Sequence, residues 1–170
     1  MKTLKFFSFI ISFIILFFSL FSITQEKDSN SFYFPTDYTD VSSEYGYRDI
    51  FGSTYFHNGM DFLAPQTSKV YACANGIVTD KGFSNSYGNY IVLQHSNGYK
   101  SLYGHLSEYF IIDIGDYVTA KDQIANVGPK YLSNGTLNGI TTGPHLHFTI
   151  FDKNGNTINP SELLKKDLSE

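Results

Sequence analysis

Hydrophobic residues follow one pattern at the N-terminus of this chain and another in the remainder. Phe6 to Ile23 is an apolar run of 18 residues without a charge, preceded by Lys2 and Lys5. As a helix this run would be about 27 Å long, close to the ~30 Å hydrocarbon core of a bilayer. The pattern therefore predicts an N-terminal hydrophobic helix that is a cleaved signal or an uncleaved anchor, rather than a buried core helix.

The flanks of this run leave both interpretations open. Ser22-Ile23-Thr24 is a poor small-x-small cleavage site, and no cysteine follows that would carry a lipid. The two lysines favour a cytoplasmic N-terminus, so we expect the remainder to be exported to the cell envelope, either periplasmic or extracellular. If the run is uncleaved, residues 6–23 would contact the cytoplasmic or inner membrane. We divide the chain into a signal peptide or N-terminal membrane anchor (residues 1–24), a polar linker (25–40) and one domain (41–170).

Short aromatic and β-branched runs, separated by turn residues, make up most of the domain. Frequent turn signals between short runs indicate a mainly β, antiparallel architecture rather than alternating strands and helices. Only Ser161 to Leu168, after Pro160, is expected as a short C-terminal helix. The expected strands lie in Lys69–Cys73, Gly76–Thr79, Asn89–His95, Tyr99–Leu106, Tyr117–Val118, Gln123–Val127 and His145–Phe151, and Asn-Gly pairs begin at Asn58, Asn75, Asn97, Asn134, Asn138 and Asn154.

Two connections in this pattern are informative. Ser96-Asn97-Gly98 joins the runs 89–95 and 99–106 as the clearest β-hairpin. Residues 129–143 are rich in Gly, Asn, Ser and Thr and show no strand pattern. Long loops inside compact domains are usually functional or disordered. Because this loop leads directly into a pair of histidines, we expect it to border a functional site.

Charge and cysteine content exclude several classes of function. Residues 31–170 hold 9 lysines and arginines against 14 aspartates and glutamates. This balance argues against a nucleic-acid partner, which requires a basic surface. Cys73 is the only cysteine, so neither a disulfide framework nor a cysteine zinc site is expected. Its apolar neighbours indicate a small buried strand residue rather than a nucleophile.

The chain has five histidines, and three of them fall in two short motifs. His145 and His147 are two residues apart in a predicted strand, where both side chains would point to one face. His57 and Asp61 flank an Asn-Gly turn that leads into a short strand. Two histidines and one carboxylate leave an open position on a tetrahedral Zn²⁺, as in catalytic rather than structural sites.

Spacing alone leaves the roles of the remaining histidines open. One member of the 145/147 pair would be left over, and His95 and His105 end the two strands of the predicted hairpin. Hydrolysis needs a base for the attacking water and a proton donor for the leaving amine. No His-Glu-x-x-His motif is present, so histidines would have to fill these roles, and the residues do not show which.

Three motifs together resemble the M23 family of zinc metallopeptidases, the lysostaphin/LytM-type endopeptidases of bacterial cell walls. They are His57-x-x-x-Asp61, Tyr103-Gly104-His105-Leu106 and Thr142-Gly143-Pro144-His145-Leu146-His147-Phe148. The similarity extends from about Tyr45 to Pro160. It implies an antiparallel β-sheet core with an open groove and hydrolysis of peptide bonds in peptidoglycan, in a stem peptide or a cross-bridge.

The same resemblance implies a role for each histidine. One Zn²⁺ per chain would be held by His57, Asp61 and His147. His105 and His145 would act as catalytic base and acid, and His95 would be a supporting residue. The chain departs from the family in its long approach to the histidine pair, with Pro129 to Gly139 inserted, and in Thr67-Ser68-Lys69, where a glycine usually precedes the strand.

Other functions remain as alternatives. Family members without the metal residues act as non-catalytic activators of other wall hydrolases, but His57, Asp61, His105, His145 and His147 are all present here. A non-haem Fe(II) oxygenase also uses two histidines and a carboxylate. A cupin-like barrel could combine the histidine pair with Asp152. Both explain the 57–61 motif less well and leave the histidine at 105 without a role.

Overall fold

The structure is a computed structural model that describes residues 31–50 and 52–165. The expected signal peptide or anchor, residues 1–24, lies outside these ranges. Within them, no helix has both the length and the apolar character needed to cross a membrane. The last part of the expected linker is described, and it begins with a short strand whose Phe32 is only 2% exposed. From this residue onward the chain packs against the domain.

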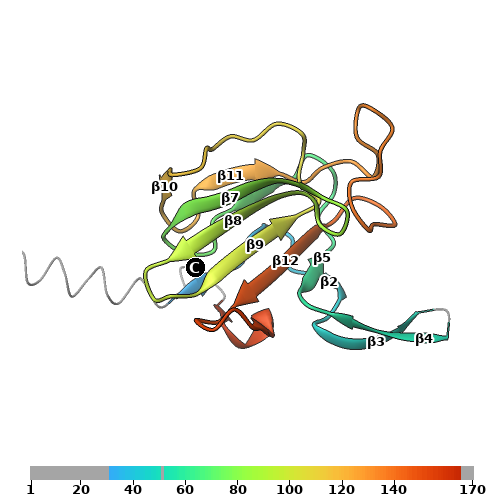
Figure 1. The fold of residues 1–170 in the computed structure, drawn as a ribbon, viewed down its shortest axis with the longest axis horizontal. Coiled ribbons are helices and arrows are strands. Elements are labelled where there is room, and N and C mark those ends of the chain that lie inside the picture. The colour runs from blue at the N-terminus through green and yellow to red at the C-terminus, as the bar shows by residue number, and fades with distance from the viewer. Residues whose placement is uncertain (1–30, 51, 166–170) are drawn as a thin grey trace, which may run out of the picture.

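An antiparallel sheet forms the centre of the molecule (Figure 1). Its strand order is β10-β7-β8-β9-β12-β5-β2, and β13 also pairs with β12. The predicted mainly β, antiparallel core is therefore confirmed. The strands are β2 Val41–Ser43, β5 Met60–Phe62, β7 Gly76–Ser84, β8 Gly88–His95, β9 Lys100–Gly104, β10 Tyr117–Val118, β12 Leu146–Phe151 and β13 Thr157–Ile158.

Strand β12 lies between β9 and β5, and this position creates the site. Leu146, Phe148 and Ile150 on one face are fully buried, and the opposite face is also covered. This explains why the run is apolar and β-branched almost throughout. In the observed register His147 lies opposite Gly104 of β9 on one side and Asp61 of β5 on the other. The predicted hairpin is present as β8 and β9, paired in antiparallel fashion.

Three two-stranded sheets surround the central sheet. They pair β1 Phe32–Tyr33 with β14 Leu164–Lys165, β6 Lys69–Tyr71 with β11 Gln123–Asn126, and β3 Gly46–Ile50 with β4 Ser53–His57. The β3–β4 hairpin projects away from the body at the lower right of Figure 1. The sequence did not predict this hairpin because the first four residues of β4 are all exposed, which leaves no alternating pattern.

The prediction of a C-terminal helix over residues 161–168 is wrong for its described part. Pro160–Glu162 forms only a 3-10 turn, η1, in which the Asn159 side chain accepts a hydrogen bond from the Ser161 amide. Strand β14 follows, and Leu164 pairs with Phe32. The edge of β1 offers backbone hydrogen bonds to this segment, and tertiary pairing overrides the local helical preference. Residues 166–168 lie outside the described residues.

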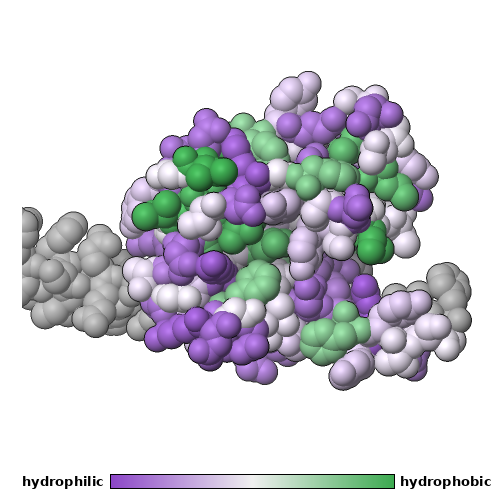
Figure 2. Space-filling model, viewed as in Figure 1, coloured by the Kyte–Doolittle hydropathy of each residue, from purple (hydrophilic) through white to green (hydrophobic). Residues whose placement is uncertain are grey.

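The face around β10 carries exposed apolar side chains, seen as green atoms at the upper left of Figure 2. Large aliphatic or aromatic side chains that are exposed in this part of the chain are Tyr109, Ile111, Ile114 and Tyr117. Because β10 and β2 are at opposite ends of the sheet order, this face is remote from the β5–β12 pairing.

Thr67 provides a test of local strain in the turn before β6, where the resemblance to M23 peptidases would lead us to expect a glycine. Its φ is +73°, in the left-handed region, where L-residues other than glycine are disfavoured by roughly 1–2 kcal/mol. Part of this cost is offset because glycine loses more chain entropy on folding. We expect Thr67→Gly to raise the free energy of unfolding by about 0.5–1 kcal/mol.

Denaturant melts would measure this change. Ser68→Gly is the matched control, because Ser68 does not have a positive φ. The control should be neutral or destabilising. A Thr67→Gly variant less stable than the unaltered protein would contradict the strain assigned to this turn.

Candidate active site and metal centre

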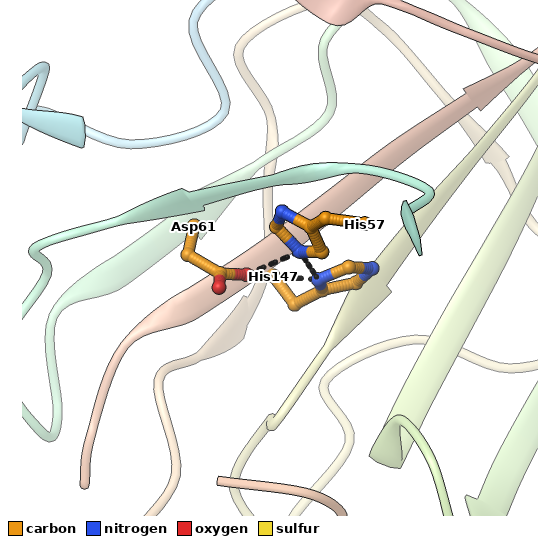
Figure 3. A group of neighbouring side chains, drawn as sticks. All are labelled: His57, Asp61 and His147. Carbon is orange, nitrogen blue, oxygen red and sulfur yellow. Dashed lines mark hydrogen bonds and ion pairs between the residues drawn. The ribbon is translucent and has the colours of Figure 1, made fainter. Parts of the chain in front are cut away.

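His57, Asp61 and His147 point toward one another from three strands or strand ends (Figure 3). His57 ends β4, Asp61 lies in β5, and His147 lies in β12. His57 Nε2 is 3.1 Å from His147 Nδ1 and 3.2 Å from Asp61 Oδ1, and His147 Nδ1 is 2.8 Å from the same oxygen. All three residues are at least 92% buried, so this contact is sheltered from bulk water.

The donor set of this cluster fits a cation. His57 Nδ1 lies 2.9 Å from the Glu44 carbonyl, which can only accept, so the proton of a neutral His57 is on Nδ1 and a lone pair on Nε2 faces the cluster. A proton on His147 Nδ1 can satisfy its contact with Asp61. His57 Nε2 and Asp61 Oδ1 would then still face each other as two acceptors with no proton between them. A metal ion between the three atoms removes this conflict.

The spacing of the three atoms agrees with this interpretation. Ligands about 2.0–2.2 Å from a tetrahedral Zn²⁺ lie about 3.3–3.6 Å apart, slightly more than the 2.8–3.2 Å seen here. The outer nitrogen of His147, Nε2, contacts Thr149 Oγ1 at 2.9 Å. Metal-bound histidines generally have such a partner on the other ring nitrogen, which fixes the orientation of the ring. His57, Asp61 and His147 could therefore hold a metal ion.

The pKa values in the cluster reflect burial and mutual contact. Burial raises the pKa of Asp61, but contacts with His147 and His57 outweigh it and hold the pKa well below its usual value. Burial lowers the pKa of His147, although Asp61 acts in the opposite direction. The cluster thus favours an ionised carboxylate beside neutral imidazole, which are the forms that bind metals.

His105 lies beside this cluster in an unusual backbone conformation. Its φ is +56°, and its amide and carbonyl are held by Tyr87 and Gly128. The ring Nδ1 donates to the Asn138 carbonyl at 2.6 Å, which leaves Nε2 as the basic nitrogen. Burial lowers the pKa of His105 to about 4, with a further contribution from His145, so the ring is neutral at neutral pH. Backbone strain of this kind is concentrated at functional sites.

His145 completes the group from the segment that enters β12. Its ring centroid is 4.5 Å from that of His105, and its Nε2 lies 3.6 Å from Asp61 Oδ1. The other nitrogen, Nδ1, donates to the Gly143 carbonyl at 2.9 Å and lies 3.3 Å from Thr141 Oγ1. A neutral His145 therefore presents an unprotonated Nε2 on the side of Asp61. The structure brings together all five residues that the sequence singled out.

These residues line an open groove of about 700 Å³, within the ~300–1,000 Å³ typical of ligand sites. The β3–β4 hairpin forms one wall, and the end of the loop 129–143, orange in Figure 1, forms another. The site is therefore accessible to a ligand from solvent. The other lining residues are Arg48, Phe56, Asn58, Ser86, Tyr87, Ile140, Thr141 and Thr142.

The geometry agrees with a comparison against protein families. Residues 55–160 match the family model described as peptidase family M23. The chain belongs to this family. The matched range contains His57, Asp61, His105, His145 and His147.

This chain matches only part of the length of individual M23 relatives. It is 38% identical over 128 residues to the DD-carboxypeptidase/endopeptidase Mpg of Neisseria meningitidis serogroup B, covering 74% of this chain and 27% of that protein. It is 33% identical over 129 residues to the peptidoglycan DD-endopeptidase ShyC of Vibrio cholerae, covering 74% and 28%. The chain thus spans about a quarter of the length of these curated relatives.

The fold is shared with a solved peptidase. The crystal structure of a zinc containing peptidase from Vibrio cholerae superposes with a TM-score of 0.65 at 30% identity, covering 81% of this chain and 40% of that chain. An antiparallel sheet core with an open groove is therefore the architecture of this M23 domain. The comparison also suggests zinc as the metal.

Asn138 is a residue of this M23 domain that the sequence reasoning did not identify as important for the site. It is fully buried, and its side chain bonds the Asn89 amide and the carbonyls of Leu106 and Pro129, while its own carbonyl holds His105. It therefore anchors the inserted loop and orients a site histidine at once. Its Asn-Gly pair was interpreted only as a turn signal, and the sequence contains no other sign of this role.

Gly59, in the turn between His57 and Asp61, tests how tightly the candidate metal cluster of His57, Asp61 and His147 is packed. A Cβ atom at this position would lie 2.5 Å from the Phe148 carbonyl oxygen and 2.8 Å from His147 Cε1. We expect Gly59→Ala to displace His147, to weaken metal affinity at least about tenfold and to lower stability by about 1–3 kcal/mol.

Competition with a chromophoric chelator would measure the metal affinity of the Gly59 variant. Gly82→Ala is the control, because a Cβ there meets only ordinary contacts, at 3.8 Å or more. Unchanged metal affinity in Gly59→Ala would contradict the tight packing described for the cluster.

His95 lies apart from the metal cluster, in a separate polar network. Its Nδ1 donates to the Asn75 carbonyl at 2.8 Å, and its Nε2 contacts Ser101 Oγ at 2.9 Å. Ser101 is bonded to Tyr103, whose hydroxyl accepts from the Cys73 amide. Cys73 is fully buried, as expected, and burial raises the pKa of its thiol to about 11. These groups stabilise the core and do not reach the groove.

His95 gives a prediction for the pH dependence of stability. Burial lowers the pKa of His95 below the ordinary value of about 6.5, although the hydrogen bond to the Asn75 carbonyl acts in the opposite direction. The unfolded chain therefore takes up a proton that the folded chain does not, and the free energy of unfolding should fall as the pH drops below about 6.5. Denaturant melts between about pH 7 and pH 5 should show a shallower fall for His95→Gln. An identical fall in both proteins would contradict a neutral buried His95.

Proposed function

We propose that the protein is a zinc metalloendopeptidase that hydrolyses peptide bonds in bacterial cell-wall peptidoglycan, in a stem peptide or a cross-bridge. The observation that carries this proposal is the convergence of His57 Nε2, Asp61 Oδ1 and His147 Nδ1 within 3.2 Å, beside two further histidines in an open groove. Two nitrogens and one oxygen form a typical set of protein ligands in catalytic zinc sites. Membership of peptidase family M23 and the names of its relatives support this substrate class.

Zinc, when bound, would supply Lewis acidity that polarises the scissile carbonyl and acidifies water. His57, Asp61 and His147 would hold the ion. The proton transfers are assigned to His105 and His145, because each donates one ring proton to a carbonyl and keeps the other nitrogen basic. One of them would take a proton from the attacking water. A protonated histidine would then stabilise the oxyanion and protonate the leaving nitrogen.

Digestion of purified peptidoglycan tests the proposal. Soluble products should appear with the zinc-loaded protein, disappear with a chelator and return when zinc is added. Mass spectrometry of products from defined wall fragments would identify the bond that is cut. Absence of any cleavage in zinc would overturn the enzymatic proposal and favour the non-catalytic activator. Metal analysis that finds iron, with activity dependent on a 2-oxoacid, would favour an oxygenase instead.

The proposed substrate also implies a location. Peptidoglycan lies outside the cytoplasmic membrane, so the enzyme would act in the cell envelope after export. Residues 1–24 would direct that export, and residues 6–23 would keep the domain at the membrane if they are not removed. Labelling intact cells with a membrane-impermeant reagent would show whether the domain is outside. A cytoplasmic domain would contradict this part of the proposal.

A further inference from the structure

Arg48 is the only arginine among 170 residues, since every other basic side chain apart from the histidines is a lysine. It lies in β3 and borders both the site groove and a second groove that share Asp61, Thr142 and His145. Its side chain is 37% exposed, so part of it can meet a bound molecule. A lysine would suffice for solubility or net charge. An arginine at this one position indicates a need for its planar, multiply donating guanidinium.

The contacts of Arg48 within the protein do not use this capacity fully. Its Nη1 donates to Ser43 Oγ, and the same atom is 3.6 Å from Asp61 Oδ2. That distance is longer than the ~2.7–2.9 Å of a charge-assisted hydrogen bond. Among the described residues, Arg48 Nε is buried and has no hydrogen-bond partner. A buried donor without a hydrogen-bond partner lowers the stability of the folded protein. Unsatisfied groups of this kind are expected at functional sites.

The charges of the site groove favour an anion near Arg48. Arg48 and Asp61 are the only lysine, arginine, aspartate or glutamate residues that line it, and a divalent metal at the cluster would make it net positive. The second groove differs, because Glu44 and Asp49 line it and would repel an anion. An anionic group of the substrate is therefore best placed on the metal side of Arg48. The group that matches a guanidinium in a peptide is a carboxylate.

The position of Arg48 limits which carboxylate it can bind. Asp61 contacts Arg48 through one oxygen and faces the metal cluster with the other. One carboxylate group therefore separates the guanidinium from the atoms that would hold the metal. A substrate carboxylate bound by Arg48 would then belong to a residue next to the scissile bond, because consecutive Cα atoms are only ~3.8 Å apart. The residue on the acyl side has no free α-carboxylate, because its α-carbonyl is part of the scissile bond. The nearest free carboxylate of a peptide is therefore the α-carboxylate of the residue that supplies the leaving nitrogen.

We propose that Arg48 binds the free α-carboxylate of the residue on the leaving-group side of the scissile bond. The site would then select peptides whose leaving residue is C-terminal or is linked through a side-chain amine, over neutral cross-bridges. This inference rests on the proposed peptidase function and specifies its substrate class.

Two synthetic peptides test the inference, identical except that the leaving residue carries an α-carboxylate in one and an α-carboxamide in the other. The zinc-loaded protein should cleave the carboxylate peptide with a kcat/KM at least about tenfold higher, mainly through a lower KM. Arg48→Gln should bring the ratio of the two kcat/KM values close to one. Arg48→Lys should leave an intermediate ratio, because lysine retains the positive charge without the paired donors of the guanidinium. Lys69→Gln removes an exposed charge outside both grooves and should retain the full ratio.

A role limited to orienting Asp61 gives a different result. Arg48→Gln would then reduce zinc affinity and slow both peptides by the same factor, and this outcome would overturn the proposal. So would equal cleavage of the two peptides by the unaltered protein. If neither peptide is cleaved, the proposed peptidase function fails, and calorimetry on the same zinc-loaded protein still decides about Arg48. Tighter binding of the carboxylate peptide, lost in Arg48→Gln, would support the inference, and equal binding would overturn it.

Discussion

Replacing His147 by alanine is expected to abolish both metal binding and peptide hydrolysis. The imidazole supplies one of three converging ligand atoms, and its Nδ1 contacts Asp61 and His57 at 2.8 and 3.1 Å. Its removal leaves two ligands, which is too few for a tight zinc site. Because metal and fold are coupled, the alanine variant should also lose the stabilisation that added zinc gives to the unaltered protein. Metal analysis after dialysis and thermal melts with and without zinc would measure both effects.

A second buried histidine provides the control for this experiment. His95→Ala also removes a buried imidazole, but from a network that bonds Asn75 and Ser101. It should lower stability while the protein still binds one zinc ion per chain. A His147→Ala protein that retains one tightly bound zinc would show that the ligand set is assigned wrongly.

Replacing His105 or His145 by glutamine is expected to separate metal binding from turnover. The rings of His105 and His145 take no part in the three contacts that join His57, Asp61 and His147. Each variant should therefore bind zinc with nearly unchanged affinity. Loss of a general acid or base typically lowers kcat by about 10²–10⁴-fold. Hydrolysis of a defined wall fragment, normalised to bound zinc, would measure this loss. If His145→Gln retained full activity on purified wall, the role assigned to His145 would be wrong.

The parts of the fold with strong periodic patterns could be predicted from the sequence. The hairpin of β8 and β9 was predicted because Asn97-Gly98 separates two strand-like runs, and β12 because apolar and β-branched residues dominate its run. The C-terminal segment failed for the opposite reason. Its conformation depends on pairing with the edge of β1, more than 130 positions earlier in the chain. The local preference of residues 161–168 carries no information about that partner.

The candidate site was predictable in its residues but not in its geometry. Spacing identified His57, Asp61 and the histidine pair, and the resemblance to M23 peptidases suggested how to divide the pair. Asn138 and Arg48 were not predicted to matter, because a buried asparagine in a turn and a single arginine carry no periodic signal. Arg48 meets Ser43 and Asp61, and Asn138 meets Asn89 and His105, only once segments distant in the sequence have packed together.

Zinc titration of the metal-stripped protein, with peptide release from purified peptidoglycan as the readout, shows whether hydrolysis depends on one bound zinc ion. We expect no release without metal and a rise that saturates at about one zinc per chain, as for one catalytic site. Full activity in the stripped protein, or no activity at any zinc concentration, would contradict this expectation.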